Sequence, residues 1–138
     1  MDNVRIIKVW QDDEIMEIKV EAKSDLVSIH QNCYIQKSEL WKASESMINY
    51  SFNYEEEKYI EFGQKDGNYT PTFSMCFLPA DLTGHILIEM DMEINDNDTR
   101  KHRCLFYISS EMGCVELFGK KLKELIQNTE GFQIVLNP

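Results

Sequence analysis

The chain has 138 residues, 43% of them hydrophobic, and its 24 acidic and 14 basic side chains give a formal net charge of −10. This length and apolar content suffice for one hydrophobic core without metals or disulfides, so we expect a single domain spanning residues 1–138. A surface this negative repels phosphate backbones and anionic lipid headgroups. We therefore expect neither nucleic acid nor a membrane as a partner.

The first residues read MDNVRI and lack the basic and apolar regions of a secretory signal. No run approaches the roughly 18 apolar residues of a membrane helix. We therefore expect a cytoplasmic protein with reduced thiols. Three of the four cysteines lie in apolar, strand-like runs, where a thiol behaves as a small buried hydrophobe. The four are Cys33, Cys76, Cys104 and Cys114.

Alternating apolar and polar residues predict three strands in the first third of the chain. From Met16 to Ala22 every second residue is apolar, while Glu and Lys fill the positions between, which is typical of a half-buried strand. A partner strand is expected over residues 4–10, joined through a polar turn at 11–13. A third strand follows over residues 27–35, where only Gln31 interrupts the apolar face.

The period then changes to that of a helix near residues 38–50, for which Ser38 is the expected N-cap. Strands over residues 58–62 and 72–78 are predicted on either side of a turn at residues 65–68. The apolar residues that recur at helical spacing in the predicted helix are Leu40, Ala43, Met47 and Tyr50.

The clearest pattern is a long hairpin. Apolar residues alternate from Ile86 to Ile94, a turn is expected at residues 96–98, and Cys104, Phe106 and Ile108 continue the apolar face on the return strand. Residues directly opposite each other in an antiparallel pair share a face. If the apolar faces coincide, the remaining face therefore combines basic and acidic side chains, namely Lys101 and Arg103 with Glu89, Asp91 and Glu93.

A second helix is predicted near residues 111–127, with Ser110 as its cap, and a last strand over residues 132–136. The chain thus reads as three strands, a helix, four strands, a helix and a strand. Antiparallel hairpins with helices added at intervals indicate an α+β fold, mostly antiparallel sheet with about seven or eight strands.

No sequence motif points to catalysis. The chain has no Gly-x-Ser-x-Gly elbow, no glycine-rich phosphate loop and no His-Glu-x-x-His stretch. We expect no catalytic residue, no metal site and no cofactor. One alternative stays open, because His102 and Cys104 share a face of a strand: a small enzyme or metal-binding module built on His85, His102 and Cys104.

Two segments are candidates for binding a protein. Between residues 50 and 62, aromatic residues are interleaved with glutamates, a combination that suits a cationic partner because rings supply buried area and carboxylates steer association. The acidic stripe of the hairpin, from Asp81 to Asp98, is the second candidate. The alternative for the first segment is a solvated turn between a helix and a strand, with its aromatics in the core. The alternative for the second is a solvated sheet face that Lys101 and Arg103 partly neutralise. The predicted contacts are Tyr54, Glu55, Glu56, Glu57 and Tyr59, followed by Asp91 and Glu93.

The segment from Asp81 to about residue 126 contains a Gly84-His85-Ile86 strand, a return strand with His102 and Phe106, and a Ser110-Glu111 step into a closing helix. In this it resembles the WapI-like immunity proteins of bacterial polymorphic-toxin systems. The resemblance implies a small cytoplasmic protein that binds and neutralises a cognate toxin domain, commonly a nuclease. It implies no catalytic residues, and its shared positions concern the fold.

Composition and resemblance agree on a leading hypothesis. A nuclease is usually basic, and an acidic protein can cover its nucleic-acid surface. We therefore expect a non-enzymatic immunity protein whose partner is a basic toxin. The alternatives are the enzyme or metal-binding module described above and a homo-oligomeric structural protein.

Overall fold

The strands form two four-stranded antiparallel sheets. The computed structural model describes residues 1–50, 55–63, 72–97 and 100–137. Sheet A has the order β3-β2-β1-β8 and sheet B the order β4-β5-β6-β7. Sheet A comprises β1 (Asn3–Gln11), β2 (Ile15–Lys23), β3 (Ser28–Gln36) and β8 (Gln133–Leu136). Sheet B comprises β4 (Lys58–Phe62), β5 (Thr72–Phe77), β6 (His85–Asn97) and β7 (Arg100–Glu111).

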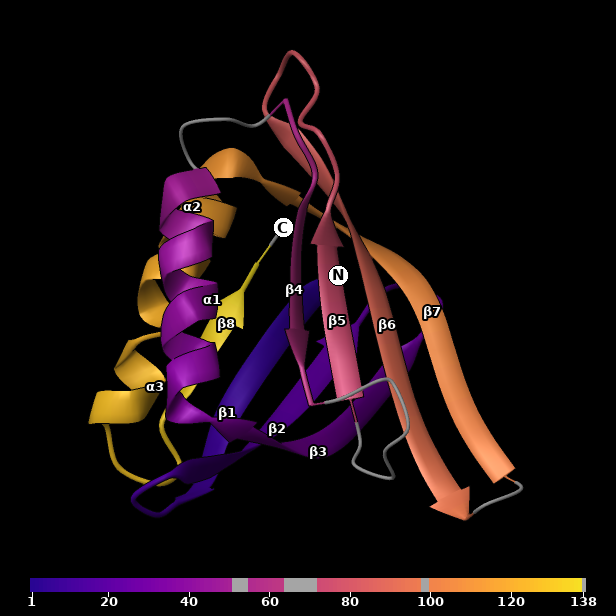
Figure 1. Cartoon of the computed structure of the whole chain (residues 1–138). Coiled ribbons are helices and arrows are strands. Elements are labelled where there is room, and N and C mark those ends of the chain that lie inside the picture. The colour runs from indigo at the N-terminus through magenta and orange to yellow at the C-terminus, as the bar shows by residue number, and fades with distance from the viewer. Residues whose placement is uncertain (51–54, 64–71, 98–99, 138) are drawn as a thin grey trace.

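Three helices complete the fold: α1 (Lys37–Tyr50), α2 (Met112–Lys121) and α3 (Glu124–Gln127). They lie together on one side of the sheets, and β7 is the outermost strand on the opposite side (Figure 1). The order of elements confirms the predicted α+β class with mostly antiparallel sheet. None of the helices in the described ranges is long and apolar enough to cross a membrane.

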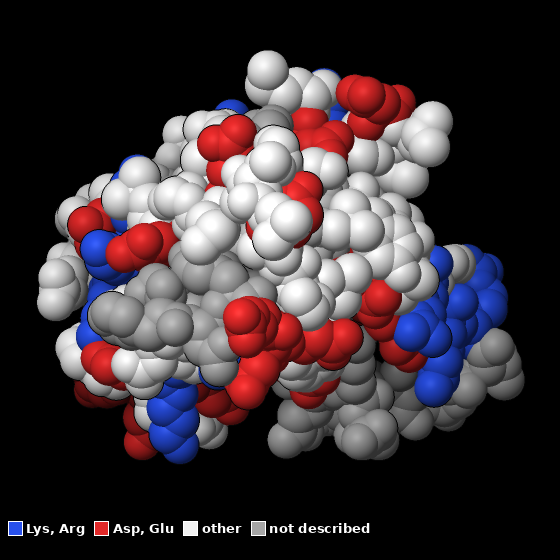
Figure 2. Space-filling model, turned by 90° about the horizontal axis from the view of Figure 1, so that it is seen from above, with Lys and Arg blue, Asp and Glu red and all other residues white. Residues whose placement is uncertain are grey.

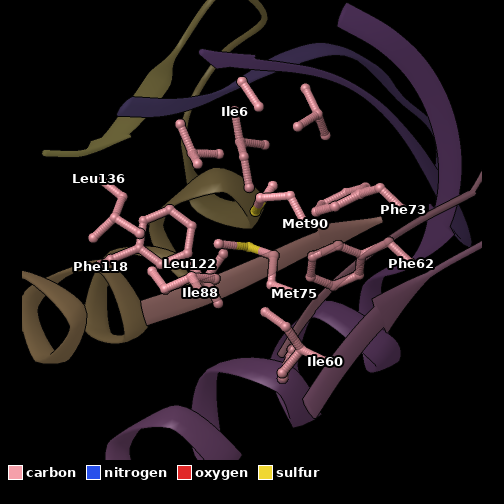
Figure 3. Packing of buried hydrophobic residues seen from close by; sticks show 14 of the residues in the cluster. Ile6, Ile60, Phe62, Phe73, Met75, Ile88, Met90, Phe118, Leu122 and Leu136 are labelled. Atoms are coloured by element: carbon pink, nitrogen blue, oxygen red, sulfur yellow. The ribbon is translucent and has the colours of Figure 1, made fainter. Parts of the chain in front are cut away.

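The core fills the space between the two sheets and the helices (Figure 3). The alternating residues from Met16 to Ala22 in β2 and from Ile86 to Met92 in β6, which the pattern assigned to the apolar face, are buried. Phe118 in α2 and Leu122 just after it are buried as well. Gln31 also lies on the buried face of β3. Its side-chain amide donates a hydrogen bond to the carbonyl of Thr72, so this polar residue links the two sheets.

Lys8 is a second buried polar residue, only 4% exposed, and it fixes the end of α3. Its Nζ donates to the carbonyl oxygens of Ile126, at 3.3 Å, and Asn128, at 2.6 Å. A cation beside carbonyls at a helix C-terminus satisfies acceptors that lack a partner within the helix. Burial lowers the pKa of this amine, with the charge of Lys37 as a smaller cause.

Both predicted helix starts are corrected. The strand β3 runs to Gln36 and α1 begins at Lys37, so Ser38 lies within the first turn and is not the N-cap. Ser110 belongs to β7, and its hydroxyl donates to the carbonyl of Asn137 at 2.7 Å instead of capping α2. Glu111 is the N-cap residue without a side-chain cap bond. The N–H of Met112 donates to the carbonyl of Gly84 at 3.0 Å.

Three further boundaries differ from the sequence prediction. Gln11, which was placed in the first turn, is the last residue of β1. The backbone of β6 continues through Asn97, so residues 96 and 97 belong to the strand and not to the turn. The predicted C-terminal helix is interrupted at residues 122 and 123, which separates α2 from α3. The predicted turn at residues 65–68 lies outside the described residues.

The four cysteines are free thiols, as predicted. Cys33 is buried on the inner face of β3, while the other three are half-buried. The helices α1 and α2 pack closely at Ser44 and Gly119, where the Ser44 hydroxyl donates to the Gly119 carbonyl at 2.7 Å.

Candidate protein-binding face

The outer face of sheet B brings tyrosines and carboxylates together from segments far apart in the sequence. The register places Tyr59, Cys76, Glu89 and Tyr107 side by side across all four strands. Because side chains alternate between faces, these four point away from the core. The next row on the same face consists of Glu61, Ser74, Asp91 and Leu105.

This face exposes four large side chains. Tyr59 is 50% exposed, Tyr107 45%, Leu105 48% and Leu87 44%. Large apolar side chains gathered on one face of a sheet are typical of an interaction surface, in contrast to single exposed residues. We call this surface the tyrosine–acid face and define it by Glu57, Tyr59, Glu61, Leu87, Glu89, Leu105 and Tyr107.

The tyrosine hydroxyls hold neighbouring carboxylates in place. Tyr107 donates to Oε2 of Glu89 at 2.8 Å, and Tyr59 donates to Oε1 of Glu61 at 2.5 Å. The hydrogen bond to Glu89 raises the pKa of Tyr107, since the carboxylate stabilises the protonated phenol. The face therefore offers fixed acceptors beside aromatic rings.

Cys76 lies between the two tyrosines. Its thiol donates to Oε2 of Glu57 at 3.8 Å, so Glu57 leans over the sheet from the start of β4. Burial raises the pKa of Cys76, and the charges of Glu57 and Glu89 raise it further. A thiol in a negative environment is a poor nucleophile, because nucleophilic attack requires the thiolate. The same negative potential favours a cation at this position.

The prediction that Asp91 contacts a partner is wrong. It was expected to offer its carboxylate on a solvated acidic stripe, yet it is only 4% exposed. Arg103 covers it with two hydrogen bonds, from Nε to Oδ1 at 3.0 Å and from Nη2 to Oδ2 at 2.7 Å. This bidentate pair neutralises the carboxylate within the chain, so Asp91 is not available to a partner.

The other predicted contacts that the structure describes are exposed or partly exposed. Glu55 and Glu56 lie in the turn before β4, next to Glu57 on the chain, and all three are exposed. Glu93 is half-buried and stands opposite Arg103. This confirms the predicted sharing of one face by the acidic and basic residues of the hairpin. Tyr54 lies outside the described residues.

The alternative site at His85, His102 and Cys104 does not assemble. His85 stands opposite Glu111 at one end of the hairpin, and His102 stands opposite Ile94 near the other end. Residue 94 follows residue 85 by nine positions, which is about 30 Å along a strand. One metal ion or reaction centre cannot contact both histidines. Among the described residues, no group of three His, Cys, Asp or Glu side chains is placed to hold a metal ion.

His85 instead belongs to a structural loop. Oδ1 of Asp81 accepts hydrogen bonds from the backbone N–H groups of Thr83 and His85, each at 2.9 Å, and from the Thr83 hydroxyl at 2.8 Å. These bonds, with the backbone N–H of His85 as the largest contribution, lower the pKa of Asp81 to about 2. Gly84 has φ +85°, a conformation that favours glycine.

A groove of about 620 Å³ separates the edge of β3 from the start of β7. It is lined by residues 28–32 and 102–104 together with Met92. His102 and Cys104 lie here, far from His85. The groove does not extend onto the tyrosine–acid face, whose residues are absent from its lining.

Charges are separated over the surface. Seen from above, acidic side chains are spread over the middle of the molecule, and a large group of basic side chains gathers at one side (Figure 2). Within sheet B, Arg100, Lys101 and Arg103 are exposed at the start of β7, whereas Glu57 and Glu111 lie at the opposite end of the sheet. A cationic partner is therefore attracted mainly to one end of sheet B.

Tyr107 and Leu105 were not predicted as contacts. The sequence contained the information, because residues 103, 105 and 107 are spaced by two and so lie on the same face of β7. The alternation had already assigned Arg103 to the face of Glu89. Comparison with protein-family models, with curated proteins and with solved structures found no match for this chain.

Proposed function

We propose that this chain is a non-enzymatic binding protein, and that its tyrosine–acid face docks on a cationic toxin domain and neutralises it. The observation that carries the proposal is the row Tyr59–Cys76–Glu89–Tyr107, where two half-exposed rings flank a negative strip. Tyrosines supply buried contact area, and carboxylates pair with lysine or arginine. The net charge of −10 adds long-range attraction for a basic protein.

The class of partner follows from its charge and from the resemblance to WapI-like immunity proteins. A nuclease domain carries a basic surface for its phosphate substrate, and an acidic protein seated on that surface blocks it. A neutralising protein of this kind acts in the cytoplasm, where it meets a toxin that enters the cell. In this role the protein needs no catalytic group of its own.

Growth rescue tests the proposed function. The gene immediately upstream is expected to encode a large secreted protein with a variable C-terminal domain. Production of that domain alone in a bacterial host should arrest growth, and co-production of this chain should restore it. A biosynthetic operon at this locus, or an arrest that this chain does not relieve, would contradict the proposal.

The acidic turn before β4 should contribute to the rate of association. Replacing Glu55, Glu56 and Glu57 with lysine should slow association with the toxin domain by about tenfold at low salt, and the loss should shrink as salt is added. Stopped-flow mixing over a range of salt concentrations measures this effect. An unchanged rate at every salt concentration would place the interface elsewhere on the chain.

A further inference from the structure

The strand β7 is a free edge of sheet B. Among the described strands it pairs with β6 alone, and at residues 102–104 a groove separates it from the edge of β3. An unprotected edge strand offers backbone donors and acceptors to another strand. The edge of β7 is 12 residues long and contains no proline.

One hydrogen bond shows which backbone groups face outward. The N–H of Ser109 donates to Oδ2 of Asp2 at 2.8 Å and so points away from β6. Backbone groups alternate in direction along an antiparallel strand, so those of Arg103, Leu105 and Tyr107 point outward too. Within the described part of the chain, the backbone N–H and C=O groups of these three residues have no hydrogen-bond partner beyond β6.

The charges along β7 make the strand complementary to itself. It begins with Arg100-Lys101-His102-Arg103 and ends with Glu111, and Leu105 and Tyr107 lie between these ends. In an antiparallel pair of two copies, with the two-fold axis at Phe106, Lys101 stands opposite Glu111 of the second copy. Leu105 then stands opposite Tyr107 of the second copy. The residues of these pairs have backbone N–H and C=O groups that point outward from β7. Two strands can form backbone hydrogen bonds only between groups that point toward each other, so this register allows hydrogen-bonded pairs.

We propose that a second copy of this chain binds along the free edge of β7, so that two four-stranded sheets join into one eight-stranded sheet. Cross-strand pairs between opposite charges and between apolar side chains stabilise this register, and each contact occurs twice because of the two-fold symmetry. The dimer needs no toxin partner and stands independently of the proposed function. It would bring two tyrosine–acid faces side by side.

Asp2 competes with the second copy for one position. In the proposed register Ser109 pairs with Arg103 of the second copy, so the hydrogen bond from Ser109 to Asp2 must open. Replacing Asp2 with alanine should therefore tighten the dimer. Carboxylates that cover an edge are a known means of limiting edge-to-edge pairing.

Sedimentation equilibrium over a wide range of protein concentrations, at physiological salt, tests the dimer. K101E and E111K should each weaken dimerisation by about tenfold, because each replaces two opposite-charge pairs with like-charge pairs. The double variant K101E/E111K should restore the wild-type dissociation constant. K101E makes the chain more negative and E111K makes it less negative, so a change in overall repulsion cannot explain a loss in both.

L105P supplies a test that does not depend on charge. The N–H of Leu105 faces outward, so proline at this edge position should leave the fold intact and abolish dimerisation. Circular dichroism and the unfolding midpoint check that the variant is folded. A protein that stays monomeric at all concentrations would overturn the proposal. A dimer that persists in L105P, or that the double charge exchange fails to restore, would overturn it as well.

Discussion

Replacing Gly119 with alanine should destabilise the protein by about 3 kcal/mol, because the added methyl group has no room. A Cβ atom at this position would lie 2.5 Å from Cβ of Met47 and 3.5 Å from its carbonyl carbon. Both atoms belong to the rigid part of α1, so the helices must move apart. That movement also disturbs the hydrogen bond from Ser44 to the Gly119 carbonyl. Urea unfolding at neutral pH measures the loss.

Gly113 provides the matched control in the same helix. It is exposed, and a Cβ atom there meets no atom within 4 Å. Gly113→Ala should therefore stabilise the protein by about 1 kcal/mol through helix propensity alone. Equal effects of the two substitutions would show that α1 and α2 do not pack as closely as described.

Alkaline pH should destabilise the protein through Cys33. Burial raises the pKa of this thiol from 9.0 to about 12, with the charges of Glu17 and Glu39 as smaller causes. The folded state therefore holds the proton more tightly than the unfolded state. The stabilisation is fully present below pH 9 and is lost as the pH rises from 9 toward 12. A shift of three pKa units corresponds to about 4 kcal/mol at the upper end of this window.

Urea unfolding at pH 7.5 and pH 10.5 measures this loss. The free energy of unfolding should differ between the two pH values, and Cys33→Ala should reduce that difference by about 2 kcal/mol. The reduction is half of the full effect because pH 10.5 lies midway between 9 and 12. Cys114→Ala leaves Cys33 in place and should keep the full difference. If the Cys33 variant shows the same pH dependence as the wild type, the thiol is not buried in the folded state.

The alternation of apolar residues predicted the strands well because a strand with one buried face has only one side for its apolar residues. The apolar residues from Met16 to Ala22 in β2 and from Ile86 to Met92 in β6 are buried as expected. Alternation does not say which sheet lies opposite, so the packing of sheet A on sheet B was not predictable. The predicted helix starts were wrong for a local reason. Ser38 and Ser110 were both predicted to be N-caps. Ser38 instead lies within the first turn of α1, and the hydroxyl of Ser110 donates to the carbonyl of Asn137.

The tyrosine–acid face was predictable in part. Glu57 and Tyr59 were identified from their composition, and the parity of the hairpin placed Arg103 beside the acids. Asp91 was assigned wrongly, because the pattern distinguishes the two faces of a strand but not a covered carboxylate from an open one. Its burial depends on the length and reach of Arg103, which is diagonal to it on the next strand. Long side chains of this kind determine which acids on a sheet remain open to a partner.

The affinity for the toxin domain encoded upstream, measured by isothermal titration calorimetry, tests the central claim most directly. E57K/E89K reverses two charges within the tyrosine–acid face. D13K/E14K makes the same change in net charge in the exposed turn between β1 and β2. We predict that E57K/E89K weakens binding by about 100-fold or more, while D13K/E14K changes it by less than about threefold. Equal losses in the two variants, or wild-type affinity in E57K/E89K, would contradict docking through this face.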